Sequence, residues 1–375
     1  MTPATYRADA GAPRLPDFPW DSLAGASARA AAHPGGIVDL SVGTPVDEVP
    51  PVVRAALAGP AAQEPGYPQT WGTPALREAV VDAMRRRYGV RNLNPDGVLP
   101  TIGSKELVAW LPTLLGIGAG ELVMLPELAY PTYEVGARLA GARFARSDST
   151  LSVGPGAVRL VWLNSPSNPT GRVLPAEHLR KVVDWARERG AVVASDECYL
   201  SLSDPDVGAV SVLHESVSGG DVTGLLAVHS LSKSSNMAGY RAAYVTGDPA
   251  LVARLLQVRK HAGMIVPRPV QAAMVAALND DEHVHVQWAR YRARRAALRA
   301  ALTAFGLRIE HSEAGLYLWA TADEPGRVTV DRLAERGILV APGEFYGPSG
   351  AAYVRVAATA PDERIAEAVR RLTAV

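Results

Sequence analysis

The chain has 375 residues, enough for one large α/β unit or for a large domain with a smaller one. Its 38 Lys and Arg balance 38 Asp and Glu, so no net charge favours nucleic acid or an anionic membrane surface, and a small-molecule partner is expected. The N-terminus lacks the regions of a signal peptide, and the longest uncharged stretch, 107–120, is too short to span a bilayer. Cys198 is the single cysteine. We therefore expect a soluble, cytoplasmic protein without an internal disulfide.

The first predicted elements are an arm and a helix. Prolines and glycines punctuate the first 50 residues, which predicts an extended arm that crosses the surface. The pattern TPALREAVVDAMRRRY predicts a helix that ends at Tyr88, with Thr73 as N-cap and Pro74 at the first helical position.

After this helix, short apolar runs alternate with helical patterns. The runs VLPTI, ELVMLP, RLVWLN, AVVAS and GLLAVHS read as strands, and amphipathic stretches lie between them. This alternation predicts an α/β fold, a mostly parallel central sheet with helices on both faces.

Beyond Asp248 the pattern changes to long helices, a proline-marked bend at 266–269 and a few strands. We predict residues 1–42 as an N-terminal arm and part of a small domain, 43–265 as a large domain and 266–375 as a small α+β domain. The arginine-rich helix at 288–306 is interpreted as a solvated face. His283 and His285, two residues apart on a helix, face different directions, so we expect exposed histidines and no metal site.

One lysine is surrounded by hydroxyl groups. Ser230 and Ser232 precede Lys233, and Arg241 follows eight positions later. The amine of Lys233 can condense with an aldehyde as a Schiff base, while the hydroxyls and the planar cation suit a phosphate dianion. The motif indicates pyridoxal 5'-phosphate, although such lysines also occur in plain surface turns.

Other polar residues follow the predicted strands, whose carboxyl ends meet at one edge of the sheet. Gly103, Ser104 and Lys105 open a helix whose N-terminus suits an anion, or they form an ordinary turn with Ser104 as N-cap. The Asn168-Pro-Thr-Gly turn holds an amide rigidly. Further along, Asp196 offers a carboxylate to a pyridine nitrogen, Tyr199 offers a phenol and Tyr130 offers an aromatic face.

Taken together, these segments resemble the class I/II aminotransferases, the fold type I pyridoxal phosphate enzymes, over nearly the whole chain from Gly43 onward. The resemblance implies Lys233 as the Schiff-base lysine and proton shuttle, Asp196 on the pyridine nitrogen, and Asn168 and Tyr199 on the ring hydroxyl. It implies Tyr130 stacked on the ring and a phosphate held by the backbone amides of Ser104 and Lys105 and by Ser230 and Arg241, with Gly103 and Ser232 in the same cofactor-binding set.

The resemblance also implies substrate contacts and a partner. Arg355 matches the arginine that binds the substrate α-carboxylate, and Gly43 the glycine whose backbone lies against the substrate, beside Asn168. Tyr67 matches the position that reaches the phosphate of the neighbouring subunit, which implies a homodimer with shared active sites.

A narrower likeness points to actinobacterial succinyldiaminopimelate aminotransferases, on segments such as LPDFPW, SDECYLSL and GILVAPGEFYGP. It implies amino transfer between glutamate and N-succinyl-2-amino-6-ketopimelate in lysine and diaminopimelate biosynthesis. Ser234 and Arg268 depart from that family's pattern. We assign Arg268 to a distal substrate carboxylate, with a solvated loop arginine as the alternative.

Other functions remain open. A recruited relative acting on another amino acid in secondary metabolism, as an aminotransferase or as a pyridoxal phosphate-dependent oxidase or lyase, keeps the same cofactor residues. A nicotinamide-dependent dehydrogenase is disfavoured because the glycines at 116–120 lack the G-x-G-x-x-G spacing and precede a strand.

Overall fold

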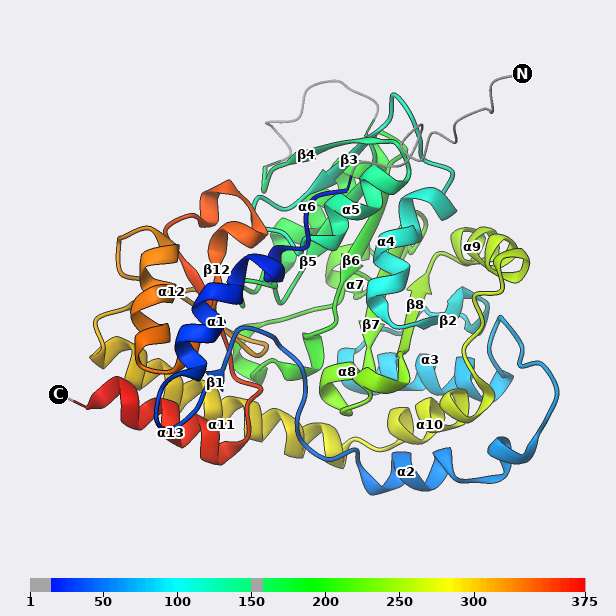
Figure 1. Ribbon diagram of the computed structural model, residues 1–375. Coiled ribbons are helices and arrows are strands. Elements are labelled where there is room, and N and C mark those ends of the chain that lie inside the picture. Colours follow the sequence, from blue (N-terminus) through cyan, green and yellow to red (C-terminus); the bar gives the residue numbers. More distant parts are fainter. Residues whose placement is uncertain (1–14, 150–157, 375) are drawn as a thin grey trace, which may run out of the picture.

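The computed structural model describes residues 15–149 and 158–374. Its centre is a seven-stranded sheet in the order β2-β8-β7-β6-β5-β3-β4, in which β8 alone runs against its neighbours (Figure 1). The strands are β2 (Val98–Ile102), β3 (Leu122–Leu125), β4 (Arg143–Arg146), β5 (Val158–Asn164), β6 (Val192–Asp196), β7 (Leu225–Ser230) and β8 (Ala242–Gly247). The predicted mostly parallel sheet is confirmed.

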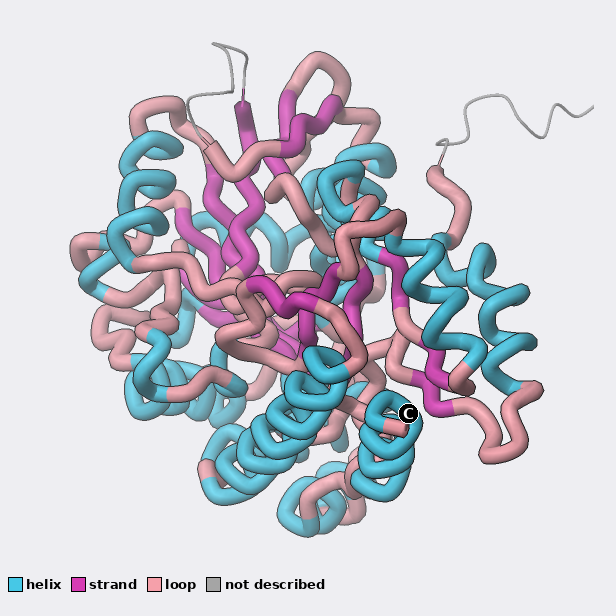
Figure 2. The backbone as a smooth tube through the Cα atoms, turned by 90° about the vertical axis from the view of Figure 1, so that its left-hand side faces the viewer, coloured by secondary structure: helices cyan, strands magenta, loops and turns pink. Residues whose placement is uncertain are grey.

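Helices cover both faces of this sheet, as Figure 2 shows in a view turned by 90°. One face carries α3 (Pro74–Tyr88), α6 (Ala176–Arg187), α7 (Glu215–Ser218) and α10 (Arg268–Asn279), with α2 (Pro51–Leu57) packed on α10. The other carries α4 (Ser104–Leu114), α5 (Thr132–Leu139) and α9 (Pro249–Ala262). Since successive strand residues point to opposite faces, Leu163 packs in the first layer and Trp162 in the second.

A smaller lobe has its own core. Its sheet has the order β12-β13-β10-β9, and β1 pairs with β11 beside it. The strands are β1 (Val38–Asp39), β9 (Arg308–Glu310), β10 (Tyr317–Thr321), β11 (Ile338–Leu339), β12 (Ala341–Pro342) and β13 (Val354–Ala357), and the helices are α1 (Ala24–Ala31), α12 (Gly326–Glu335) and α13 (Asp362–Thr373). Their apolar side chains form one buried cluster, so residues 23–40 share a core with residues 298–372.

Helix α11 (Glu282–Ala304) belongs to both lobes. Tyr291 packs with the core under α4 and α5, while Leu298 and Leu302, two and three turns later, pack in the core of the small lobe. Figure 1 shows α11 running beside α13. The helix therefore connects the lysine-bearing sheet to the small lobe.

One feature differs from the sequence-based expectation, and a second bears on the predicted domain boundary. The predicted arm contains a helix, α1, which packs against α12, because AGASARAA is rich in alanine, the strongest helix former. Residues 1–14 of the predicted arm lie outside the described residues. Helix α10 packs with α2 and α3, so residues 268–279 lie with the large sheet. The boundary between 265 and 266 stays a prediction, and this packing favours a later one.

Other features agree with the prediction. Thr73 caps α3, with its side-chain oxygen accepting from the Leu76 amide at 3.2 Å. Within the described parts of the chain, no helix combines the length and the hydrophobicity that crossing a membrane requires.

Candidate active site

Lys233 lies in a short helix directly after a buried strand. Strand β7 ends at Ser230, whose Oγ accepts from the Ser232 amide at 3.1 Å and so caps α8 (Leu231–Ser234). The Nζ of Lys233 donates to the carbonyl oxygen of Gly43. Burial, with the nearby charge of Arg355, lowers the pKa of Lys233 to about 8. An amine with this pKa is partly neutral, and so nucleophilic, near physiological pH.

Asp196 ends the neighbouring strand β6. Its side chain accepts from Tyr133 Oη at 2.8 Å and from the Cys198 amide at 3.2 Å. Burial raises the pKa of this carboxyl group, and these hydrogen bonds only partly oppose the rise. Within residues 15–149 and 158–374, no lysine or arginine pairs with it, so the site presents a buried carboxylate without a cation of its own.

Arg355, on β13, is a buried cation. It is 3% exposed, and its Nη1 and Nη2 donate to Asn168 Oδ1 at 2.8 Å and to Ser41 O at 2.6 Å. Its guanidinium lies 4.1 Å from the ring centroid of Tyr317. Both hydrogen-bond acceptors are neutral, and no carboxylate of the described chain pairs with it. A buried cation in this setting suits a carboxylate ligand.

The start of α4 is the predicted phosphate site. Gly103 has φ of 78°, and a side chain there would collide with the guanidinium of Arg241. Ser104 and Lys105 are the first helical residues, so their amides belong to the unpaired N–H groups of the helix start. The N-cap position is Gly103, so the interpretation of Ser104 as N-cap is wrong. Arg241, itself in the left-handed region, is kept beside this start by a 2.7 Å bond to Ala238 O.

Several buried tyrosines lie near Asp196. The hydroxyl oxygens of Tyr199 and Tyr317 are 3.1 Å apart, and Tyr130 meets Tyr133 edge to face, with 5.8 Å between ring centroids. Burial raises the pKa of Tyr130 to about 12 and that of Tyr199 well above its ordinary value. These phenols are therefore neutral and can donate hydrogen bonds.

Two predicted site residues lie together in another place. Tyr67 is 96% exposed in the single chain. Arg268 pairs with Glu64 at 2.5 Å, and its Nη2 donates to Tyr67 O at 3.2 Å. No contact between described residues joins either of them to Lys233. The exposure of Tyr67 leaves it open to a second copy of the chain.

Sequence reasoning missed several residues of the site. Asn164 ends β5 directly beside Asp196 and donates to its carbonyl oxygen at 2.8 Å. Its position after a buried strand was the same signal that identified Asp196. Tyr133 and Tyr317 carry no such signal, because only the packing of α5 and of β10 brings them to Asp196 and Tyr199.

The arrangement fits pyridoxal phosphate. It offers an amine of lowered pKa for an aldehyde, a buried carboxylate for a protonated ring nitrogen, and for a phosphate the glycine-opened helix start under Arg241. By contrast, the described residues contain no group of three or more His, Cys, Asp or Glu side chains placed to hold a metal ion.

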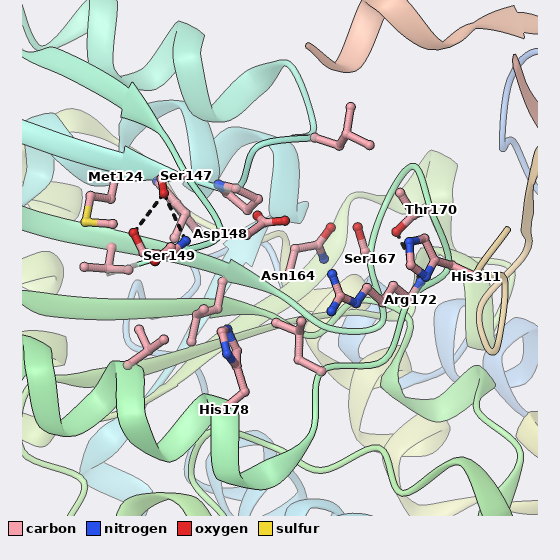
Figure 3. Close-up of a pocket in the computed structure, with 17 residues that line it drawn as sticks. Met124, Ser147, Asp148, Ser149, Asn164, Ser167, Thr170, Arg172, His178 and His311 are labelled. Carbon is pink, nitrogen blue, oxygen red and sulfur yellow. Dashed lines mark hydrogen bonds between the residues drawn. The ribbon is translucent and has the colours of Figure 1, made fainter. Parts of the chain in front are cut away.

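A separate pocket lies on the α6 side of the sheet (Figure 3). The 164–171 turn contributes Ser167 and Thr170 to this pocket, with Arg172, His178 and His311 nearby. Asn164 also lines this pocket, whereas none of the residues predicted from the sequence for the active site does. The turn therefore contacts Arg355 through Asn168 and lines this pocket with Ser167 and Thr170.

The chain matches the family "Aminotransferase class I and II" over residues 36–372. It is 65% identical to a probable aminotransferase of Mycobacterium tuberculosis (96% of this chain, 85% of that protein) and 60% identical to the 4-dedimethylamino-4-oxo-anhydrotetracycline transaminase OxyQ of Streptomyces rimosus (96% and 99%). A solved structure, a probable N-succinyldiaminopimelate aminotransferase from Thermus thermophilus, superposes with a TM-score of 0.84 at 30% identity (95% and 99%). The chain therefore belongs to the class I and II aminotransferases and is a pyridoxal phosphate-dependent transaminase.

Proposed function

We propose that this aminotransferase moves an amino group from glutamate to the carbonyl of a secondary metabolite, an acceptor of the kind named for the Streptomyces rimosus relative. The observation that carries the proposal is 60% identity to that transaminase over 99% of its length. The structure of the site supports the reaction type, because Asp196 ends one strand, Lys233 follows the neighbouring strand, and the charge of Arg355 acts on Lys233.

Each group has a defined task in this proposal. Pyridoxal phosphate, when bound, supplies the electron sink for a carbanion at the substrate's α-carbon. Lys233 takes and returns the proton with Nζ, for which a pKa of about 8 suits a general base near neutral pH. Asp196 would accept a hydrogen bond from the ring nitrogen and so keep that nitrogen protonated. Arg355 binds and orients the donor carboxylate, and the buried surroundings exclude water.

A second candidate is amino transfer to N-succinyl-2-amino-6-ketopimelate, in lysine biosynthesis. The Thermus thermophilus neighbour supports it. This acceptor carries a distal carboxylate, for which Arg268 is the predicted ligand. In the single chain, however, Glu64 already neutralises Arg268, so a distal carboxylate would have to displace an ion pair of 2.5 Å. This arrangement favours the first proposal.

A panel of acceptors tests the proposal. With glutamate as donor, kcat/KM is measured for 4-dedimethylamino-4-oxo-anhydrotetracycline, N-succinyl-2-amino-6-ketopimelate and the keto acids of common amino acids. We expect the tetracycline intermediate to rank first. If N-succinyl-2-amino-6-ketopimelate ranks first, the second candidate is correct.

A further inference from the structure

The helix that carries Lys233 is too short to fix that lysine by itself. Helix α8 spans four residues, and a single turn is unstable without tertiary contacts. The backbone then passes through Asn236, which has φ of 51° and is 8% exposed. The side-chain Nδ2 of Asn236 donates to Gln287 Oε1 at 2.9 Å and to Glu48 O at 3.1 Å. The lysine turn is thus attached to α11.

Gln287 bonds a second segment at the same time. It is 3% exposed, and its Nε2 donates to Asp47 Oδ2 at 2.8 Å. Asp47 lies four residues after Gly43, whose carbonyl oxygen accepts from Lys233. The lysine turn and the 43–47 segment, which meet at the Lys233–Gly43 contact, are therefore both bonded to Gln287. Its Oε1 accepts from the lysine turn and its Nε2 donates to the 43–47 segment.

Asp47 itself is fixed by a cation. Arg294, two turns further along α11 and 4% exposed, binds it in two-pronged fashion at 2.7 and 2.8 Å, and also bonds Asp362 of α13 at 2.6 Å. Burial alone would raise the pKa of Asp47, but the bonds from Arg294 and Gln287 leave this pKa below its ordinary value. The carboxylate is ionised, so it must accept, and this fixes the orientation of the Gln287 amide.

A further attachment lies one turn earlier on α11. His283 Nε2 is 2.8 Å from Ser235 Oγ, and its Nδ1 is 3.1 Å from Asp280 Oδ2. The expectation of an exposed His283 is therefore wrong, because the turn after Lys233 covers it. Helix α11 thus grips two successive residues, Ser235 and Asn236.

From these contacts we propose that Gln287 is a positioning residue of the transamination site, which sets the placement of the Lys233 amine against the 43–47 segment. It acts through Asn236 and Asp47. Amine placement decides the rate of proton transfer, and a shift of about 1 Å costs about a hundredfold. The inference rests on Lys233 as the reactive amine of the proposed function.

The test exchanges the polarity of the Gln287–Asp47 bond. In Gln287→Glu two carboxylates face one another, and in Asp47→Asn two amides do. The double variant restores one donor and one acceptor between the two positions. The oxygen that remains at position 47 keeps the bond from Arg294 Nη2, whereas the bond from Arg294 Nη1 to Oδ2 is lost. Val284→Ala is the control, since it weakens the packing of α11 at a buried apolar residue outside this network.

Two quantities are measured on the full-length enzyme. The first is the limiting single-turnover rate constant of the glutamate half-reaction, written kcat in this test, which needs no acceptor. The second is the rate at which cofactor-free protein binds pyridoxal phosphate at Lys233, trapped with borohydride and mapped. We expect each single variant to lose about ten- to a hundredfold in kcat, and the double variant to recover to within about threefold. Compared with the wild type at the same pH, Gln287→Glu should also lose less kcat towards pH 5, because its carboxyl group protonates there while Lys233 protonates in both proteins.

Equal kcat in all variants, or a double variant as slow as the product of the single losses, overturns the inference. So does a matching kcat loss in Val284→Ala at an equal drop in thermal midpoint. Trapped cofactor on another lysine overturns this inference together with the proposed function. Trapping at Lys233 with an unaffected Gln287→Glu overturns this inference alone.

Discussion

Arg355 Nη1 donates to Asn168 Oδ1 at 2.8 Å, so a cation from the small lobe meets an amide from the large sheet's 164–171 turn. The amide is neutral and the guanidinium is buried. The site thus holds a cation ready for a carboxylate, at the place where the two lobes touch.

Arg355→Ala should lower kcat/KM for every amino donor and keto acid. Loss of a buried charged partner costs roughly 2–5 kcal/mol, which is ~30-fold or more in rate. Arg355→Lys keeps the charge but loses the two-pronged geometry, so it should recover only part of the activity. Steady-state kinetics with three donors measures this. A loss confined to one donor would contradict the role of Arg355.

Binding of pyridoxal phosphate to the cofactor-free protein should accelerate as pH rises through about 8, the pKa of Lys233, because the neutral amine reacts. The folded protein binds fewer protons at Lys233 than the unfolded chain between that pH and the ordinary pKa of about 10.4. The contribution of Lys233 to the free energy of unfolding therefore rises with pH between about 8 and about 10.4. Stopped-flow absorbance gives the loading profile. A midpoint near 10.4 would show an exposed, ordinary lysine.

Asp196→Ala should lower kcat roughly a thousandfold, since it removes the carboxylate proposed for the ring nitrogen. Tyr133→Phe, which removes one hydrogen bond to that carboxylate and keeps it in place, should cost about tenfold. Kinetics at matched cofactor saturation checks the order. Near-normal turnover of Asp196→Ala would refute its role.

Arg268→Ala should raise KM for N-succinyl-2-amino-6-ketopimelate no more than it raises KM for glutamate, because Glu64 already pairs with the guanidinium. Glu64→Gln is the matched variant that frees the cation. If Arg268→Ala selectively raises KM for the long dicarboxylic acceptor, and Glu64→Gln lowers it, then Arg268 is the distal ligand of the second candidate.

Mixing a Tyr67 variant with a Lys233 variant tests shared active sites. Tyr67 projects from the single chain and is proposed to complete the phosphate site of a second copy. Mixed dimers should regain about one intact site each. If mixed dimers form and stay inactive, each chain builds its own site.

The sequence indicated those parts of the site that follow strands. Asp196 and Lys233 stood out because charges after buried strands need partners, and the parallel sheet places strand ends together. Tyr317 and Gln287 could not be found in this way. Each acts through packing between elements far apart in the chain, β10 on Tyr199 and α11 on Asn236, and apolar periodicity does not report such contacts.

The most direct test of transamination at Lys233 is a single turnover with glutamate and no acceptor. We expect one 2-oxoglutarate per active site, no ammonia, and loss of the borohydride-trapped label at Lys233, because the amino group stays on the cofactor. Release of ammonia with the label at Lys233 restored after turnover would contradict it, and would identify lyase or oxidase chemistry instead.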